Sequence, residues 1–298
     1  MMRRALAAAT LAGGAALAYA TLIERRWYAL RRVTVPGVLR RPGARLKILH
    51  VSDLHLDSGQ AHRVRFVASL AELDYDLVVA TGDLLEGFGM EDAAAEALAP
   101  LISEGRPGLA VLGSHDRFGP TLRAPWSYLR GPSKDAEPAP ARALDTPRLI
   151  RRLELVGYEV LLGGATSVKT PSGMVAVGGI DDPHLPTTII PPVEALRPTI
   201  DDAVLHLGLV HAPYAVALDR LLEAGHDLVL SGHTHGGQLR VPGYGALVTN
   251  CDLPTGRARG LSRYRDAWLH VSAGLGHSRF APARFACRPE ASLLELTS

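Results

Sequence analysis

Five short apolar runs in this chain each lead, within three residues, into an aspartate or a histidine. Their lengths and compositions are those of buried strands. They span residues 46–51, 76–80, 109–112, 204–210 and 227–230. Helical apolar spacing separates some of them, at 61–73, 92–103 and 214–224. Strands that alternate with helices predict an α/β layered domain, and such sheets bind ligands at the carboxyl ends of their strands.

The acidic and imidazole residues after these runs suit metal binding. In order they are Asp53 and His55, Asp83, His115, His211, and His233 with His235. In the Asp-x-His and His-x-His pairs, both side chains lie on one side of an extended segment, because strand side chains alternate. Carboxylates with imidazoles suit divalent Mn, Fe or Zn. One such residue alone is more often a turn or a structural histidine, but five elements in order predict a divalent-metal site.

The first 45 residues form a segment of their own. Residues 5–23 carry no charge and have about the length that spans a bilayer. The alternatives are a retained membrane anchor, a cleavable signal peptide and a buried helix. Ala18-Tyr19-Ala20 fits the small-x-small pattern of a signal cleavage site. The lack of a polar face argues against a buried helix.

Basic residues on both sides of this run bear on its orientation. Arg3 and Arg4 precede it, and a larger group follows it: Arg25, Arg26, Arg31, Arg32, Arg40, Arg41, Arg45 and Lys47. Excess positive charge on the C-terminal side disfavours translocation of that side. Residues 1–45 are therefore predicted to be a single retained anchor with a basic linker that suits anionic lipid, and the catalytic domain is favoured on the cytoplasmic face.

Residues 46–298 are predicted to form one domain. A proline-rich stretch near 119–147 is predicted to be a long insertion. The chain has 32 basic and 30 acidic residues, so no global field favours nucleic acid as a partner. Two cysteines, Cys251 and Cys287, are too few for a disulfide framework. They leave one disulfide or two buried thiols open, and the thiols are favoured.

Longer motifs around these residues resemble a known family. The resemblance is carried by Ser231-Gly232-His233-Thr234-His235-Gly236-Gly237-Gln238, Val271-Ser272-Ala273-Gly274-Leu275-Gly276, Arg284-Phe285 and Arg288-Pro289-Glu290. From about Leu46 onward, the chain resembles the calcineurin-like metallophosphoesterase superfamily and, within it, the membrane-associated bacterial YkuE-type subfamily. This resemblance implies a four-layer α/β/β/α sandwich of two packed mixed sheets, with metals at the carboxyl edge of the strands.

The resemblance also implies which residues hold two divalent metal ions (Mn, Fe or Zn). The two cations would lie about 3–4 Å apart. The ligands would be Asp53, His55 and His235 for the first cation, His211 and His233 for the second, and Asp83 between them. A hydroxide that bridges the two cations would attack phosphorus in line.

Two further residues are implied to take part in the reaction. His115 would stand near the leaving group and stabilise or protonate its oxygen. Asp116 would orient His115, as a carboxylate commonly orients an imidazole. Arg117 and His184 are candidates for substrate contact, because arginine suits phosphate and His184 follows a predicted strand.

Ser114 departs from the family pattern, which usually has an asparagine ligand of the second metal at this position. A serine hydroxyl is shorter and a poorer neutral ligand. Either Ser114 coordinates, a water fills the gap, or the second site binds weakly; a bridging water with a weakened second site is favoured. A neighbouring group in place of the asparagine is the remaining alternative.

The sequence therefore predicts a metallophosphoesterase that cleaves a phosphodiester or pyrophosphate bond. The anchor favours a lipid-linked substrate, and the subfamily resemblance makes a nucleotide–sugar–lipid pyrophosphate one candidate. The competing hypothesis is a degenerate metal-binding regulatory module with a weakened second site. His115 argues against that hypothesis, because it serves turnover rather than metal binding.

Overall fold

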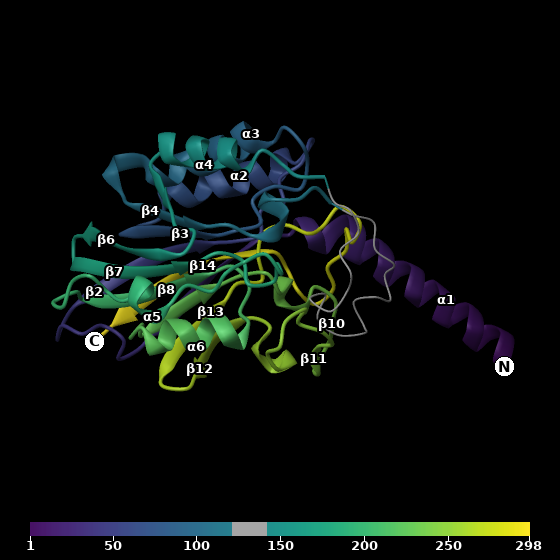
Figure 1. Cartoon of the computed structure of the whole chain (residues 1–298). Helices are drawn as coiled ribbons and strands as arrows, with labels where there is room; N and C mark the ends of the chain where they lie inside the picture. Colours follow the sequence, from purple (N-terminus) through teal and green to yellow (C-terminus); the bar gives the residue numbers. More distant parts are fainter. Residues whose placement is uncertain (121–141) are drawn as a thin grey trace.

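Two six-stranded sheets form the body of the protein and pack face to face (Figure 1). This computed structural model describes residues 1–120 and 142–298. Helices cover the outer face of each sheet, which gives the layer order α/β/β/α. The predicted fold class is confirmed.

The first sheet is mixed. In spatial order it contains β1 (Ala29–Val35), β14 (Glu290–Thr297), β2 (Arg45–Val51), β3 (Leu77–Thr81), β4 (Gly108–Val111) and β5 (Tyr158–Val160). Strands β2 to β5 are parallel neighbours, whereas β14 runs antiparallel to β2 and parallel to β1. Residues 29–35, predicted as part of a basic linker, instead belong to this sheet, because their backbone pairs with the C-terminal strand.

The second sheet has the same size and is also mixed. In spatial order it contains β12 (Gly260–Tyr264), β13 (Ala267–Val271), β9 (Leu228–Ser231), β8 (Leu205–Val210), β7 (Gly173–Ile180) and β6 (Gly164–Thr170). The four central strands are parallel, and the two edge strands β12 and β6 are antiparallel to their neighbours. A separate two-stranded hairpin joins β10 (Arg240–Val241) to β11 (Gly245–Ala246).

Burial on both faces explains why the central strands are continuous apolar runs. On β3, Leu77 and Val79 pack between the two sheets, whereas Val78 and Ala80 pack under the helices. All four side chains are fully buried. A strand of a parallel sheet that is covered on both faces has no solvent side, so it needs no polar alternation.

Helices on the outer faces complete the core. The first sheet is covered by α2 (Ala61–Ser69), α3 (Glu91–Leu98) and α4 (Thr146–Leu155), and the second by α5 (Val193–Leu196) and α6 (Ala215–Glu223). The helix predicted at 92–103 is shorter in the structure, because the chain passes into a 3-10 turn at Ala99–Gly105. Pro100 lies in that turn and cannot continue an α-helix.

The proline-rich stretch predicted as an insertion, 119–147, lies mostly outside the described residues. Its two ends meet: Phe118 bridges to Ala143, and the Gly119 N–H donates to the carbonyl of Arg142 at 2.9 Å. Its last two residues begin α4. The chain therefore leaves and rejoins the domain at one place.

An N-terminal helix projects from the body (Figure 1). Helix α1 covers Met2–Ala18 and continues through a π-helical turn, Tyr19–Ile23, and a 3-10 turn, Glu24–Arg26. These 25 residues are long and apolar enough to cross a membrane, and only 6% of the apolar window is buried. The alternative of a buried core helix is therefore wrong, whereas an anchor and a signal peptide both fit.

The end of this helical segment is fixed to the body. Glu24 is only 2% exposed, and its carboxylate accepts the N–H groups of Ala286 at 3.0 Å and Cys287 at 2.6 Å. The carbonyl of Ala20 accepts the N–H of Arg284 at 3.1 Å. The apolar helix therefore ends against the loop that precedes β14.

Candidate metal centre and active site

Six predicted metal ligands and the predicted catalytic residue His115 come together where the strands of both sheets end. They are Asp53 and His55 after β2, Asp83 after β3, His115 after β4, His211 after β8, and His233 with His235 after β9. His115 and His235 are partly exposed, and the other five are buried. The carboxyl edge that the sequence predicted as the ligand-binding edge is therefore where these residues meet.

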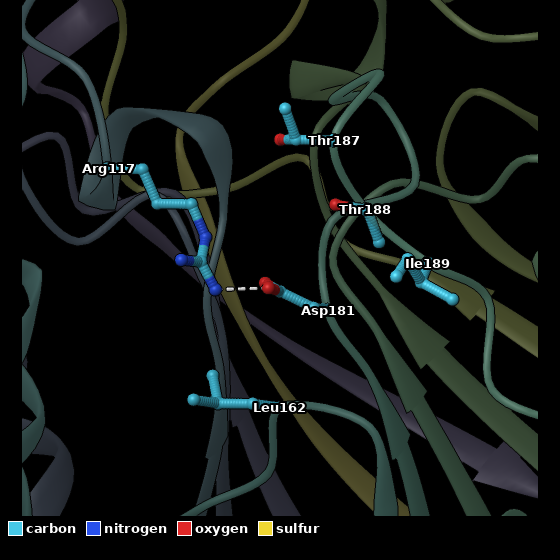
Figure 2. Close-up of a pocket in the computed structure, with 6 residues that line it drawn as sticks. All are labelled: Arg117, Leu162, Asp181, Thr187, Thr188 and Ile189. Carbon is cyan, nitrogen blue, oxygen red and sulfur yellow. Dashed lines mark hydrogen bonds and ion pairs between the residues drawn. The ribbon is translucent and has the colours of Figure 1, made fainter.

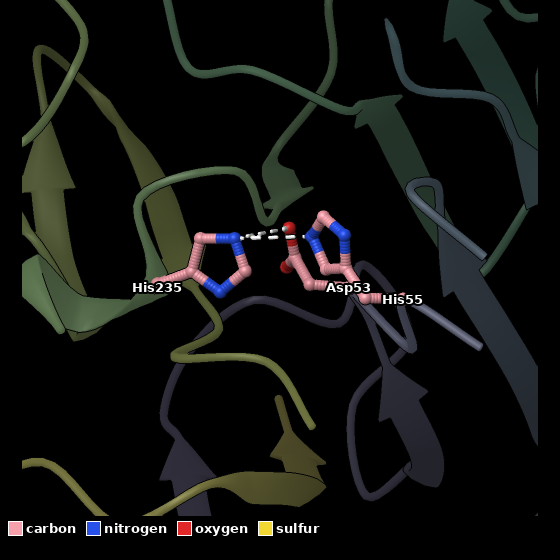
Figure 3. Close-up of side chains that lie close together, drawn as sticks. All are labelled: Asp53, His55 and His235. Atoms are coloured by element: carbon pink, nitrogen blue, oxygen red, sulfur yellow. Dashed lines mark hydrogen bonds and ion pairs between the residues drawn. The ribbon is translucent and has the colours of Figure 1, made fainter. Parts of the chain in front are cut away.

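Asp53, His55 and His235 form the first cluster (Figure 3). One ligand atom from each lies within 4.8 Å of the others. The Nε2 atoms of His55 and His235 face each other at 3.2 Å, and Nε2 of His235 lies 3.8 Å from a carboxylate oxygen of Asp53. Two facing ring nitrogens can share at most one proton, so this geometry fits a cation between them.

Asp53, Asp83 and His211 form a second cluster of the same size. The Nδ1 of His211 lies 2.6 Å from the carbonyl of Thr81, so Nδ1 donates and Nε2 is left to bind a cation. One oxygen of Asp83 lies 3.3 Å from Nε2 of His211 and 3.5 Å from Nε2 of His55. That oxygen therefore lies between a ligand of the first cluster and a ligand of the second.

His233 lies beside His211, with ring centroids 5.3 Å apart. Its Nε2 is 3.0 Å from the carbonyl of Asn250, so Nε2 donates and Nδ1 is the nitrogen that can accept a cation. Its N–H donates to the carboxylate of Asp53 at 3.0 Å. The backbone of His233 thus braces one predicted ligand while its ring lies near another.

Backbone strain is concentrated at these residues. Positive φ angles occur at Asp53 (51°), His55 (44°), Asp83 (51°), His233 (69°) and His235 (48°). Residues other than glycine rarely adopt this left-handed region, at a cost of about 1–3 kcal/mol each. Because strain of this kind persists only where its surroundings enforce it, its presence at five predicted ligands points to function.

Two glycines allow the carboxylates to sit against neighbouring loops. A Cβ on Gly113 would overlap the carboxylate of Asp83, and a Cβ on Gly232 would overlap Ser52 and the carboxylate of Asp53. Both glycines directly precede predicted site residues in the chain. Because glycine has no Cβ, the backbone of the loops after β4 and β9 can pack directly against the acidic side chains.

Burial and neighbouring charges raise the pKa of some candidate ligands and lower that of others. Burial raises the pKa of Asp53. Burial acts in the same direction on Asp83, but the charges of His211 and His115 outweigh it and hold the pKa of Asp83 well below its usual range. Burial and the charge of His55 lower the pKa of His235 strongly. An ionised Asp83 and a neutral His235 are the forms that bind a metal.

Glu86 is a site residue that the sequence reasoning missed. One of its oxygens lies 2.6 Å from Nδ1 of His55 and 3.1 Å from Nδ1 of His115. Burial lowers the pKa of His115, but the charge of Asp83 and the adjacent carboxylate of Glu86 outweigh it and raise that pKa to about 9. The available signal was the position of Glu86, three residues after Asp83 on a loop already assigned to the site.

Asp116 has different partners from those predicted. Its carboxylate accepts the backbone N–H groups of Leu84 at 2.7 Å, Leu85 at 3.0 Å and Gly113 at 2.9 Å. The expectation that Asp116 orients the His115 ring is therefore wrong, because these three donors occupy the carboxylate and Glu86 lies against the ring instead. Asp116 holds the loops after β3 and β4 together.

Ser114 lies in the 3-10 turn Ser114–Asp116, next to the ligands. In this turn the N–H of His115 donates to the carboxylate of Asp83 at 2.9 Å. Across the site, Asp182 is fully buried, and its Oδ2 has no hydrogen-bond partner among the described residues. Burial lowers the pKa of His211, but the charges of Asp83 and Asp182 outweigh it and raise that pKa. The other oxygen of Asp182 accepts the N–H of His184 at 2.9 Å.

His184 lies beside His233. Its ring centroid lies 4.9 Å from that of His233, and its Nδ1 is 3.0 Å from the hydroxyl of Tyr214. Burial and the charge of His233 lower the pKa of His184 to about 4, so the ring is neutral at physiological pH. His184 is thus positioned as a neutral hydrogen-bonding group at the edge of the site.

Arg117 lines a cavity of about 230 Å³ beside the site (Figure 2). The remaining lining residues are Leu162, Asp181, Thr187, Thr188 and Ile189. The guanidinium of Arg117 forms an ion pair with Asp181, which follows β7 (Figure 2). Contact between Arg117 and a substrate phosphate would therefore require the arginine to exchange this partner.

Two packed mixed sheets with an Asp- and His-rich centre at their carboxyl edge define a metal-dependent hydrolase. The chain belongs to the calcineurin-like phosphoesterase family, whose model matches residues 46–237. Members of this family use two metal ions, and the clusters above are the candidate ligands. The protein is thus a metallophosphoesterase, as the sequence predicted.

Relatives of nearly the same length support this membership. The phosphodiesterase YaeI of Escherichia coli is 30% identical over 97% of this chain and 96% of its own. The uncharacterized metallophosphoesterase YkuE of Bacillus subtilis is 27% identical over 99% of this chain and 94% of its own. Because both alignments cover nearly the whole chain, they include the N-terminal helix as well as the domain.

Proposed function

We propose that this protein hydrolyses a phosphodiester or pyrophosphate bond with two divalent cations, and that its substrate is linked to a lipid. One observation carries the proposal: two acidic and histidine clusters share Asp53 and lie at the strand ends, with every ligand atom of a cluster within 4.8 Å of the others. Carboxylate oxygens together with imidazole nitrogens are donors that suit Mn, Fe or Zn.

The first proposed ligand set is the first cluster, Asp53, His55 and His235. For the second cation we propose His211 from the second cluster together with His233, whose ring lies beside it, and Asp83 as the bridge. The bridging role is supported by the Asp83 oxygen that lies within 3.5 Å of ligand nitrogens on both sides. When bound, the two cations neutralise the phosphate charge and lower the pKa of a water to give a nucleophile near neutral pH.

His115 is proposed to protonate the leaving group. Its Nδ1 faces Glu86, so Nε2 is the nitrogen that can donate a proton to the departing oxygen. Its raised pKa keeps it protonated at neutral pH. Arg117 and His184 are proposed substrate contacts, since Arg117 lines the adjacent cavity and His184 lies next to His233.

The lipid-linked substrate and a membrane location rest on the N-terminal helical segment Met2–Arg26, which contains α1. This segment is long and apolar enough to cross a membrane, and its end packs on the loop before β14. We propose a single retained anchor with the catalytic domain on the cytoplasmic face, since a basic flank follows the apolar run. A nucleotide–sugar–lipid pyrophosphate is one substrate that fits both the anchor and the chemistry.

The experiment that tests this function uses the full chain in detergent, stripped of metal and then supplied with Mn²⁺, Fe²⁺ or Zn²⁺. We expect hydrolysis of bis(p-nitrophenyl) phosphate or of a diacyl-linked pyrophosphate in mixed micelles only after metal is restored. An exposed carboxylate variant, Asp74→Asn, serves as a control with unchanged activity. Near-zero turnover on all substrates at two bound metals per chain would favour the regulatory-module hypothesis.

The departure at Ser114 gives a separate prediction about the second metal. We expect Ser114→Asn to raise the affinity for the second cation about tenfold, with unchanged or higher activity, because an amide oxygen is a better neutral ligand than a hydroxyl. Titration of Mn²⁺ into metal-free protein by calorimetry measures both sites. Loss of metal in this variant would mean that Ser114 does not occupy a ligand position.

The Oδ2 atom of Asp182 is our candidate to compensate for Ser114, because it has no hydrogen-bond partner among the described residues while Oδ1 accepts the N–H of His184. We expect Asp182→Asn to weaken the second site about tenfold and to leave the first unchanged, because Asn keeps the shape but removes the charge. Equal affinity of this variant and the natural protein for both cations would instead assign the missing ligand to Ser114 itself or to water.

A further inference from the structure

The hairpin β10–β11 exposes apolar side chains directly after a predicted metal ligand. It begins five residues after His235, and its tip and flanks carry Leu239 (51% exposed), Val241 (44%), Tyr244 (75%) and Leu247 (51%). The hairpin belongs to neither six-stranded sheet. Large exposed apolar side chains that gather on one element mark a binding surface.

This hairpin lies next to the N-terminal helix. An apolar cavity of about 310 Å³ is lined by residues from the helix, the hairpin flank and the loop before β14: Ala16, Leu17, Ala20, Leu239, Ala283 and Phe285. Figure 1 shows β10 and β11 at the same end of the body as the base of α1. The exposed apolar surface of the hairpin is thus continuous with that of a helix long enough to span a bilayer.

The segments around the hairpin and the base of the helix are rich in basic residues and poor in acidic ones, although Arg279 of the loop before β14 pairs with Asp57. Residues 235–251 and 267–289 contain no aspartate or glutamate, and residues 1–52 contain only Glu24, which is buried. Arginine and aromatic side chains are interspersed, as where Arg288 stacks on the exposed ring of Trp27 at 4.2 Å. Segments with aromatic and basic residues and few acidic ones are typical of a protein surface at an anionic membrane interface.

We propose that the β10–β11 hairpin is a second membrane contact, which inserts Leu239, Tyr244 and Leu247 into the headgroup and upper acyl region beside α1. With the helix it gives the domain two points of attachment. Two points fix the tilt of a domain on a surface, whereas a single helix leaves the domain free to rotate about it.

The position of the hairpin determines where the active site lies relative to the bilayer. Arg284 is fully buried, its N–H donates to the carbonyl of Ala20 at the end of the apolar helix, and its guanidinium lies 3.3 Å from Nδ1 of His235. One residue therefore separates the helix from the metal centre. A docked hairpin, which follows His235 in the chain, would hold that centre at the level of the lipid headgroups.

This inference deepens the proposed function, because it restricts the substrate to phosphate esters presented at the bilayer surface. Its test is independent of catalysis. Tyr244→Cys in the full chain is labelled with a fluorophore, and the protein is reconstituted in phosphatidylcholine–phosphatidylglycerol vesicles that carry lipid-attached nitroxide quenchers. Cys251 and Cys287 are buried, so the new cysteine is the preferred labelling site.

The matched control is Leu155→Cys, an apolar position of similar exposure (74%) at the end of α4, over the first sheet. We expect nitroxides near the headgroup to quench label 244 about five times more strongly than label 155, as for a group buried 5–10 Å into the interface. Equal quenching at both positions would overturn the proposal. Self-quenching between two 244 labels without lipid quenching would also overturn it and assign the hairpin to a second copy.

A second variant keeps the test independent of any effect of the label. Replacing Leu239, Tyr244 and Leu247 together by serine should shift a label at Trp27→Cys toward water, because the domain loses one of its two attachments. As a control, replacing Leu155, Val216 and Ile189 together by serine should leave the depth of that label unchanged. Failure of the phosphohydrolase screen would leave these depth measurements unaffected, so the two proposals fail separately.

Discussion

Replacing Asp83 by alanine should reduce hydrolysis by at least about 1,000-fold and lower the metal content from two ions to one or none per chain. The Asp83 oxygen lies 3.3 Å from a nitrogen of His211 and 3.5 Å from one of His55. It therefore lies between a ligand of the first proposed set and a ligand of the second. Stabilisation of the transition state by paired cations is worth several kcal/mol, and each 1.36 kcal/mol is a factor of ten in rate.

Stability separates this effect from misfolding. In the metal-free protein, the charges of His211 and His115 hold the pKa of Asp83 well below its usual range, and its carboxylate accepts the N–H of His115 at 2.9 Å. Removal of Asp83 therefore takes away a stabilising partner, so metal-free Asp83→Ala should melt below the metal-free natural chain while its circular dichroism spectrum at room temperature stays that of a folded protein. The natural protein should gain more stability than the variant when Mn²⁺ is added. Unchanged metal content in Asp83→Ala would contradict the bridging role.

The metal-binding region was accessible to sequence reasoning for a physical reason. Proposed ligands such as Asp53 and His55 directly follow strands whose apolar runs are visible in the sequence, and the parallel topology brings the carboxyl ends of such strands to one edge. Local pattern and topology therefore agree about where these side chains must lie. The layered α/β class could be predicted from the same alternation of strands and helices.

The residues that reasoning missed act through contacts between distant segments. Glu24 reaches Cys287 across 263 residues, and Arg284 reaches His235 across 49. Strand β1 was overlooked because Arg31 and Arg32 made it resemble a linker, and its edge position leaves these side chains in solvent. Such contacts depend on how the C-terminal loop packs, which no local spacing encodes.

For Asp116, in contrast, a local sequence pattern predicted a contact with His115 that the structure does not have. Its place directly after His115 suggested a pair, but neighbours in a tight turn point their side chains in different directions. In the structure the carboxylate of Asp116 turns to three backbone N–H groups, and the partner of His115 is Glu86, 29 residues earlier. Adjacency in sequence predicted the type of partner but not its identity.

Replacing His115 by asparagine should lower kcat about 100- to 10,000-fold on a substrate with an alkyl leaving group, the range expected for loss of a general acid. With p-nitrophenol as the leaving group the loss should be far smaller, because that oxygen departs without a proton. Metal content should stay at two, since His115 is proposed to serve the leaving group rather than a cation. Equal losses on both substrates would contradict proton donation.

The role of His115 as an acid also predicts the direction in which kcat changes with pH. His115 acts as an acid, so its contribution is present below its pKa and is lost as pH rises through that value, which is about 9 without metal. Cations bound to Asp83 would cancel part of the charge that raises this pKa, so the alkaline fall in kcat should begin below pH 9. His115→Asn should abolish that fall. Glu86→Gln should instead move it to lower pH, because Glu86 also raises the pKa of His115.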